Sequence, residues 1–183
     1  MIFLQPKSLP ELASCLAQKP GKDAYLVSGC TDFLAKRNGK VWDAEMLISL
    51  TAVPELRRIN SLAGKVSIGA ACTHTQVETD ALVQQYFPAL SQACGNVGSR
   101  QIRNRGTVGG SIGNASPAGD IYPVLLALDV EAAVMNSTCL WIGSSPASAK
   151  PRLQRMRPSL PLNFRCRQRT ISMPSPSSVS APR

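Results

Sequence analysis

The glycine-rich stretch from Arg103 to Asp120 constrains the fold of this chain more than any other segment. It holds five glycines, with small hydroxyl and amide residues between them. Without Cβ atoms in the way, several main-chain N–H groups can approach one ligand, and converging N–H groups bind anions, most often phosphate. Asp120 ends the stretch, and its carboxylate can accept hydrogen bonds from ribose hydroxyls. A glycine-rich surface loop without a ligand is the alternative interpretation.

A second candidate phosphate site lies nearer the N-terminus. Residues 24–28 are apolar and rich in strand formers, which predicts a buried strand. Gly29, Cys30, Thr31 and Asp32 follow, and then a short helix is expected. Thr31 and Asp32 can cap that helix, and its first N–H groups would face a diphosphate. An ordinary strand–turn–helix corner without a ligand is the alternative.

The remaining pattern predicts a mixture of helices and strands. Ser8, Pro10 and Glu11 indicate a helix start, and a short crossover between two strands favours a small parallel sheet. We expect helices after Ser8, Thr73 and Pro88 and over residues 122–128, a helical turn at Pro54, and strands over residues 24–28, 45–50, 65–70 and 130–134.

The basic charge of the chain is concentrated at its C-terminal end. The formal net charge is +9, and residues 137–183 contain eight Lys or Arg and no Asp or Glu. Helical and strand periodicity both disappear after Asn136, which predicts a Ser/Pro/Arg-rich tail that is disordered or translated out of frame. Nucleic-acid binding through this tail is a further hypothesis, but the tail has too few aromatic residues for base stacking, so no nucleic-acid partner is expected.

The reactive residue types form no recognisable catalytic or metal-binding pattern. The six cysteines are scattered without a C-x-x-C pair, so no metal or iron–sulfur site is expected, and the thiols are interpreted as reduced and partly buried. His74 is the only histidine and is interpreted as a loop or cap residue. Arg100, Arg103 and Arg105 are expected to form a solvated face or a subunit contact, with phosphate neutralisation as the alternative.

The chain is also expected to be cytoplasmic. No apolar run has the length of a membrane span, and the first residues lack the basic and apolar regions of a signal peptide. We therefore expect no membrane partner.

The two candidate phosphate sites together resemble a known family, the FAD-binding medium subunits of molybdopterin-dependent dehydrogenases such as xanthine dehydrogenase and carbon monoxide dehydrogenase. Residues 25–32 look like the first FAD-binding loop of this family, where Gly-Gly-Thr-Asp or Gly-Gly-Thr-Asn is usual. Residues 101–117 resemble the second loop closely. The resemblance covers residues 1–136.

This resemblance implies an α+β chain with a vanillyl-alcohol-oxidase-type FAD-binding fold. FAD would lie between one α+β subdomain at residues 1–54 and a second, incomplete one at residues 55–136, and the family's C-terminal domain would be missing. Asp120 would hold the adenosine ribose. The residues expected around the diphosphate are Tyr25, Leu26, Val27, Ser28, Gly29, Cys30, Thr31, Asp32, Thr107, Val108, Gly109, Gly110 and Ser111.

By the same resemblance, the chain would be the flavin subunit of a heterotrimeric oxidoreductase. Molybdopterin would lie on a molybdenum-binding partner subunit, and 2Fe-2S clusters on an iron–sulfur partner subunit. Electrons would pass from the clusters through FAD to NAD or another acceptor. Because the flavin carries the redox chemistry, no catalytic residue is expected on this chain.

Two departures from the family pattern leave alternatives open. Cys30 stands where the family usually has its second glycine, and the resemblance stops abruptly near residue 136, which suggests truncation or a frameshift. An inactive remnant, which keeps a partner-binding surface but no working flavin site, is the second hypothesis. A flavin reductase of cell-wall precursor synthesis would share the fold, but the sequence offers no candidate proton donor for it.

Overall fold

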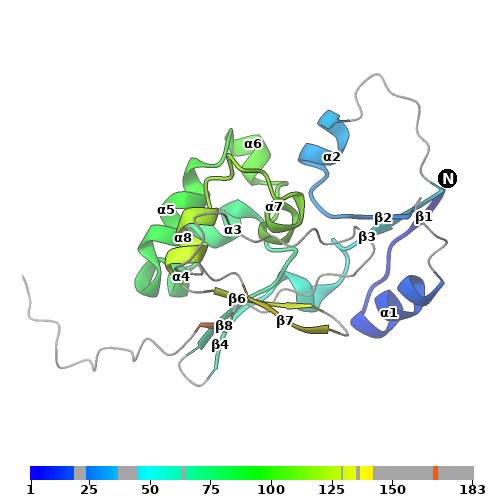
Figure 1. Cartoon of the computed structure of the whole chain (residues 1–183), viewed down its shortest axis with the longest axis horizontal. Coiled ribbons are helices and arrows are strands. Elements are labelled where there is room, and N and C mark those ends of the chain that lie inside the picture. The colour runs from blue at the N-terminus through cyan, green and yellow to red at the C-terminus, as the bar shows by residue number, and fades with distance from the viewer. Residues whose placement is uncertain are drawn as a thin grey trace, which may run out of the picture.

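The N-terminal part of the computed structural model is a three-stranded parallel sheet in the order β1-β3-β2 (Figure 1). Helices α1 and α2 lie on opposite sides of this sheet. The elements are β1 (Ile2–Leu4), α1 (Leu9–Ala17), β2 (Ala24–Val27), α2 (Thr31–Lys36) and β3 (Met46–Ser49). The predicted parallel sheet is therefore confirmed, with β1 as an additional strand.

The structure describes residues 1–18, 24–36, 45–62, 65–128, 130–134, 137–141 and 167–168. In this described part of the chain, no helix is long and apolar enough to span a membrane.

Successive side chains of β3 point to opposite faces of the sheet, one covered by α1 and the other by α2. Met46 and Ile48 belong to the apolar cluster that contains Leu12 of α1, whereas Leu47 packs with Val27 in a cluster contacted by Phe33 of α2. Successive side chains of a strand point to opposite faces, so a strand covered on both sides is apolar throughout. All four residues of β3 are buried for this reason.

The predicted start of α1 is confirmed in detail. Ser8 is the N-cap, and its hydroxyl accepts a hydrogen bond from the Glu11 N–H at 3.3 Å. The Glu11 carboxylate accepts from the N–H of Lys7 at 2.7 Å, one residue before the expected partner. The Ser8 contact satisfies an N–H group that the first helical turn cannot bond internally, and the Glu11 contact fixes the chain just before the helix.

The strands after β3 pair antiparallel, in a hairpin and in a second three-stranded sheet in the order β7-β6-β8. Helices fill the sequence between these two sheets (Figure 1). The elements are a 3-10 helix (Pro54–Arg57), β4 (Ile59–Leu62), β5 (Lys65–Ile68), α3 (His74–Thr79), α4 (Ala81–Tyr86), α5 (Pro88–Asn96), α6 (Arg100–Arg103), α7 (Val108–Asn114), α8 (Tyr122–Ala127), β6 (Val130–Val134), β7 (Ser137–Trp141) and β8 (Arg167–Gln168).

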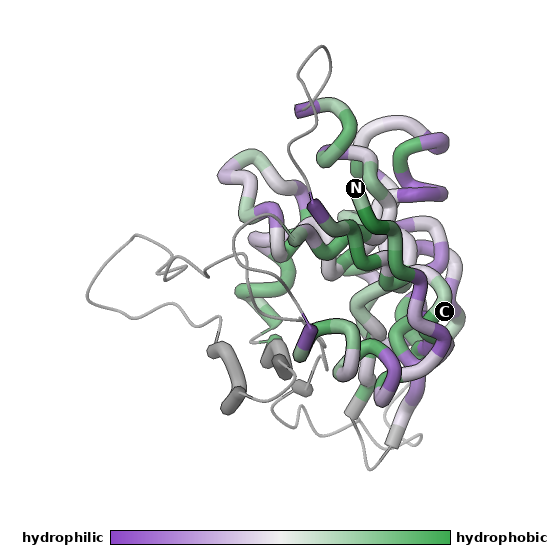
Figure 2. The backbone as a smooth tube through the Cα atoms, turned by 90° about the vertical axis from the view of Figure 1, so that its right-hand side faces the viewer, coloured by the Kyte–Doolittle hydropathy of each residue, from purple (hydrophilic) through white to green (hydrophobic). Residues whose placement is uncertain are grey.

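One large apolar core holds these helices together. It joins β5 to α3, α4, α5, α7 and α8 through fully buried residues such as Val77, Val83, Cys94 and Leu125. Figure 2 shows hydrophobic stretches (green) running through the interior and hydrophilic residues (purple) on outer turns. The chain is thus α+β, as predicted.

The structure differs from the sequence-based prediction in three places. Strands β1 and β4 and helices α4 and α6 were not predicted, because each is only one turn or a few residues long and carries little periodicity. The glycine-rich stretch was expected to be a loop, but residues 108–114 form helix α7. Its glycines are compatible with a helix because Thr107 caps its first turn.

The third difference lies beyond Asn136, where no regular structure was predicted. Residues 137–141 form β7 and pair antiparallel with β6. Their sequence, Ser-Thr-Cys-Leu-Trp, contains β-branched and aromatic residues that suit a strand. The prediction for the rest of the tail falls on residues 142–166 and 169–183, which lie outside the described residues.

Candidate functional site

The first predicted segment turns sharply between β2 and α2. Among the described residues, no acceptor is bonded to the N–H groups of Gly29, Cys30, Thr31 or Asp32. The hydroxyl of Ser28 is buried and likewise has no partner in the described part of the chain. Buried polar groups are nearly always paired, so the orphaned Ser28 hydroxyl indicates a ligand at this turn, where the neighbouring N–H groups are also available.

The second predicted segment begins at Thr107, the N-cap of α7. The Thr107 hydroxyl accepts from the Gly110 N–H at 3.1 Å, and a Cβ at position 110 would lie 2.9 Å from that hydroxyl. Thr107 is buried, and it forms an isolated antiparallel bridge with Thr73. This glycine is therefore needed for the cap of the helix.

The expectation of free N–H groups in this second segment is corrected by the structure. The N–H groups of Val108 and Gly109 donate to the carbonyls of Cys72 and Ala70, at 3.0 and 2.9 Å. The Gly110 N–H donates to the Thr107 hydroxyl, and the Ser111 N–H donates to the Thr107 carbonyl. The main chain of residues 108–111 is thus bonded to its own fold, and the side chain of Ser111 is the polar group left at this position.

The two segments lie directly against each other although they are far apart in the sequence. A Cβ at position 29 would overlap the carbonyl oxygen of Arg105 and lie 2.9 Å from the Cα of Gly106. A Cβ at position 106 would in turn lie 3.6 Å from the Thr31 hydroxyl. Close backbone approach of this kind requires glycine. The fold therefore joins the two predicted segments into one candidate site.

Cys30 has a left-handed backbone, with φ at +61°. The position thus has the conformation that glycine adopts without cost. Its side chain packs against the cluster of Val27 and Leu47, and its thiol donates to the Ser28 carbonyl at 3.4 Å. Burial raises the pKa of this thiol, and the nearby Arg105 charge opposes the rise. The thiol is therefore a neutral group with an apolar contact.

His74 is buried at the centre of the site, with 1% of its surface exposed. It follows the N-cap Thr73, whose hydroxyl and N–H both bond Gln76 in a capping box. The predicted cap at Thr73 is confirmed, but His74 is the buried first residue of α3, so its interpretation as a loop or cap residue is wrong. Its Nε2 lies 2.9 Å from the Ser111 hydroxyl, and its main-chain N–H donates to Gly106.

The electrostatic environment keeps His74 neutral. Burial lowers its pKa from the ordinary value of 6.5, the Asp120 charge opposes this, and the Arg103 charge adds to it. Asp120 is exposed, so the predicted ribose-binding carboxylate faces solvent close to this histidine. His74 and Tyr122, which bonds the Ser111 carbonyl, were missed as site residues. No local pattern in the sequence marks them, because each reaches Ser111 only through the fold.

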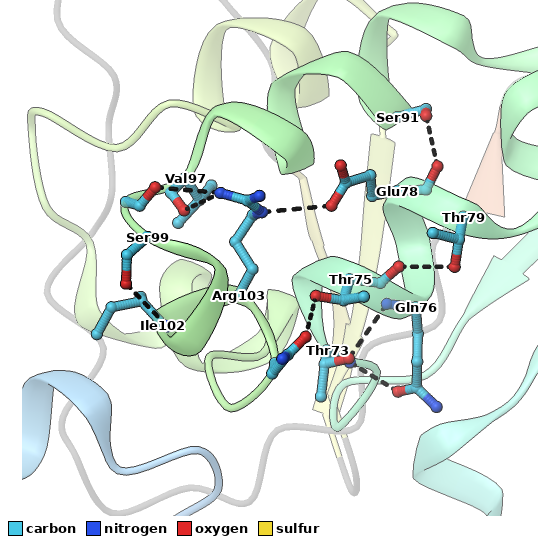
Figure 3. A network of polar contacts seen from close by, with 12 residues as sticks. Thr73, Thr75, Gln76, Glu78, Thr79, Ser91, Val97, Ser99, Ile102 and Arg103 are labelled. Carbon is cyan, nitrogen blue, oxygen red and sulfur yellow. Dashed lines mark hydrogen bonds and ion pairs between the residues drawn. The ribbon is translucent and has the colours of Figure 1, made fainter.

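Arg103 has a structural role in this arrangement. Its Nη1 donates to the Gly98 carbonyl at 3.1 Å, and its Nε lies 3.3 Å from Glu78 Oε2 (Figure 3). These contacts tie α6 to the end of α5 and to α3. The expected solvated face is therefore wrong for Arg103, whereas Arg100 and Arg105 are exposed.

The other reactive groups are compatible with a binding role for the site. No cluster of three or more His, Cys, Asp or Glu residues that could hold a metal ion occurs in the described ranges. Burial raises the pKa of Cys72 to about 11 and that of Cys94 to about 12. Both thiols are therefore inert core residues, and their predicted burial is confirmed.

Comparison with known proteins identifies the family. Residues 1–140 match the family described as "FAD binding domain in molybdopterin dehydrogenase". The chain belongs to this family. Among its relatives, the nicotinate dehydrogenase FAD-subunit of Eubacterium barkeri is 33% identical over 127 residues, which are 69% of this chain and 43% of that protein.

A further relative and a solved structure are also similar to this chain. The carbon monoxide dehydrogenase medium chain of Hydrogenophaga pseudoflava is 35% identical over 66% of this chain and 41% of that protein. The crystal structure of quinoline 2-oxidoreductase from Pseudomonas putida 86 superposes with a TM-score of 0.77 at 25% identity, over 92% of this chain and 58% of that one. The chain thus matches about two fifths of the length of the nicotinate and carbon monoxide dehydrogenase subunits.

Proposed function

We propose that this chain binds FAD between the turn at residues 28–32 and the segment at residues 107–111. The observation that carries this proposal is the packing of Gly29 against Arg105 and Gly106, which unites the two segments. The residues fit the cofactor: the first segment offers four N–H groups without acceptors and an orphaned Ser28 hydroxyl in the described structure. A diphosphate supplies acceptors for such donors.

Each predicted residue is assigned a place in this proposal. Residues 25–27 form the strand that leads into the turn, and Ser28, Gly29, Cys30, Thr31 and Asp32 donate to the diphosphate. Thr107, Val108, Gly109 and Gly110 form the opposing wall, where Ser111 adds its hydroxyl. Asp120 binds the adenosine ribose. We further propose that the fold is of the vanillyl-alcohol-oxidase type, with subdomains at residues 1–54 and 55–136.

When bound, FAD supplies reversible redox chemistry. The chain's own residues bind and orient it. The Cys30 side chain packs on the side of Val27 and Leu47. His74 is buried and its Nε2 is bonded to the Ser111 hydroxyl, so its ring is engaged within the fold.

We propose that the chain acts as the FAD subunit of a molybdenum hydroxylase-type dehydrogenase. Molybdenum-binding and iron–sulfur partner subunits would accept electrons from the substrate and deliver them to the flavin site, and NAD or another acceptor would remove them. The family match and the names of the relatives support this proposal. We do not favour the alternative of an inactive remnant, because both segments of the site are folded and in contact.

Titration of the purified chain with FAD tests the binding proposal. We expect saturable binding at one site, followed by the change in flavin absorbance and fluorescence. A Gly29→Val variant, which places bulk between the two segments, should bind much more weakly. If the folded wild-type chain shows no saturable binding, the proposal is wrong for this chain. Co-purification with partner subunits tests the assembly separately.

A further inference from the structure

The imidazole of His74 joins the helices α3 and α7 at the proposed diphosphate site. It is the only histidine of the chain. Its ring lies beside Gly106, where a Cβ would come within 3.2 Å of the His74 Cδ2. Its Nε2 lies 2.9 Å from the Ser111 hydroxyl. A buried polar side chain therefore reaches a half-buried serine of the predicted cofactor site.

The partners of the two ring nitrogens distinguish between the tautomers. A neutral imidazole carries one proton, on Nδ1 or on Nε2. Nδ1 is buried and has no partner in the described residues. An orphaned buried N–H is rarer than an unpaired acceptor, so a proton on Nδ1 is disfavoured. The proton then lies on Nε2, which donates to Ser111 Oγ.

This assignment determines what Ser111 can do. A hydroxyl that accepts from His74 keeps its own proton for another acceptor. The main-chain N–H groups of residues 108–111 are already bonded within the chain, so this proton is the donor that these four residues can still offer. If His74 instead accepted from Ser111, the hydroxyl would have only lone pairs left and would repel an anion.

The backbone of Ser111 is held as well as its side chain. Tyr122 Oη donates to the Ser111 carbonyl at 2.7 Å and to the Ile112 carbonyl at 3.2 Å. Gly119 leaves room for this tyrosine, because a Cβ at position 119 would overlap its ring. The serine is thus fixed from α3 on one side and from the start of α8 on the other.

We propose that His74 is a positioning residue that holds Ser111 as a hydrogen-bond donor to the diphosphate of FAD. This proposal rests on the proposed function, since it needs FAD at this site. His74 itself does not touch the cofactor. It acts through the hydroxyl of Ser111.

Binding of FAD to three variants tests the proposal. His74→Leu and Ser111→Ala should each raise the Kd for FAD about tenfold, the loss expected for one hydrogen bond to a charged group. The double variant should lose no more than either single variant, because both changes remove the same donor. His74→Gln, whose amide reaches the position of Nε2, should restore binding to within about threefold of the wild type. Circular dichroism and urea unfolding establish that each variant is folded.

A second measurement is independent of the variants. In nitrogen-15 NMR of the chain, prepared without a histidine tag, the single imidazole should show the Nε2–H tautomer. The Nδ1–H tautomer would overturn the proposal. So would FAD binding that is unchanged in folded His74→Leu or Ser111→Ala. Failure of the wild-type chain to bind FAD would instead overturn the proposed function, and this inference with it.

Discussion

Gly29 lies so close to Arg105 that the Arg105 carbonyl oxygen occupies the space where a Cβ of residue 29 would be. This contact brings a turn of the parallel sheet against the segment that leads into α7. Lys36 reinforces it, because its Nζ bonds both Asp32 within α2 and Asn114 at the end of α7. The site exists only where these two parts of the chain meet.

Gly29→Ala should therefore destabilise the fold and weaken FAD binding together. The new methyl group meets backbone atoms, which cannot rotate away, and such overpacking costs about 1–3 kcal/mol. Urea unfolding and FAD titration measure the two effects. Gly113→Ala is the matched control, because Gly113 is exposed within α7 and alanine favours a helix. Equal stability of Gly29→Ala and the wild type would contradict the contact.

Cys30→Gly should be more stable than Cys30→Ala. At an ordinary position glycine is the less stable of the two by up to about 1 kcal/mol, because it has more conformational freedom when unfolded. At a φ of +61° the Cβ costs about 1–2 kcal/mol, so the order is reversed. The difference in the free energy of unfolding between these two variants isolates the backbone effect from the loss of the thiol.

The same pair of variants tests whether Cys30 limits cofactor binding. Because the thiol packs against Val27 and Leu47, we expect Cys30→Gly to change the Kd for FAD by less than about threefold. A much larger gain in affinity would show that the side chain obstructs the diphosphate.

The stability of the chain should fall as the pH drops below neutral. Burial lowers the pKa of His74 in the folded state, so the unfolded state binds more protons below the ordinary pKa of 6.5. The contribution of His74 to the free energy of unfolding is fully present above pH 6.5. It is lost as the pH falls toward the pKa of His74 in the folded state, by about 1.4 kcal/mol per pH unit. The Asp120 charge opposes this trend and the Arg103 charge adds to it.

Urea unfolding of the wild type and of His74→Gln, compared between about pH 5 and about pH 7.5, measures this contribution. The variant lacks the titrating group, so its stability should depend less on pH. Parallel curves for the two proteins would mean that His74 is not responsible.

Arg103→Ala should reduce stability and leave the intrinsic affinity for FAD nearly unchanged. The guanidinium forms an ion pair with Glu78 and donates to the Gly98 carbonyl, and loss of these contacts should cost about 1–3 kcal/mol. Arg100→Ala on the same helix is the control, because Arg100 is exposed and its loss should be nearly neutral. A rise in the Kd for FAD without loss of stability would favour the phosphate-neutralising hypothesis for Arg103.

Several local features were predictable because they depend on neighbours in the sequence. Ser8 and Thr73 were identified as helix caps, since each hydroxyl bonds an N–H three residues later. The apolar face of α1, with Leu12 at its centre, follows from helical spacing. The two candidate ligand-binding segments were likewise marked by glycines next to hydroxyl residues.

The features that were missed depend on partners far away in the sequence. β1 has three residues and exists because Ile2, Phe3 and Leu4 pair with β3. The N–H groups of Val108 and Gly109 donate to the carbonyls of Cys72 and Ala70, and the glycine content of the sequence cannot reveal these long-range bonds. A lone histidine after a helix cap carries no sign that its ring will be buried against Ser111.

The sequence by itself determined the helix caps, the apolar faces, the family and the two segments of the proposed site, because short-range spacing and residue type encode these features. Only the tertiary structure decided that Gly29 contacts Arg105, that α7 retains few free donors and that His74 bonds Ser111. These contacts join residues widely separated along the chain. Their geometry comes from the packing of whole helices and strands, which no local pattern specifies.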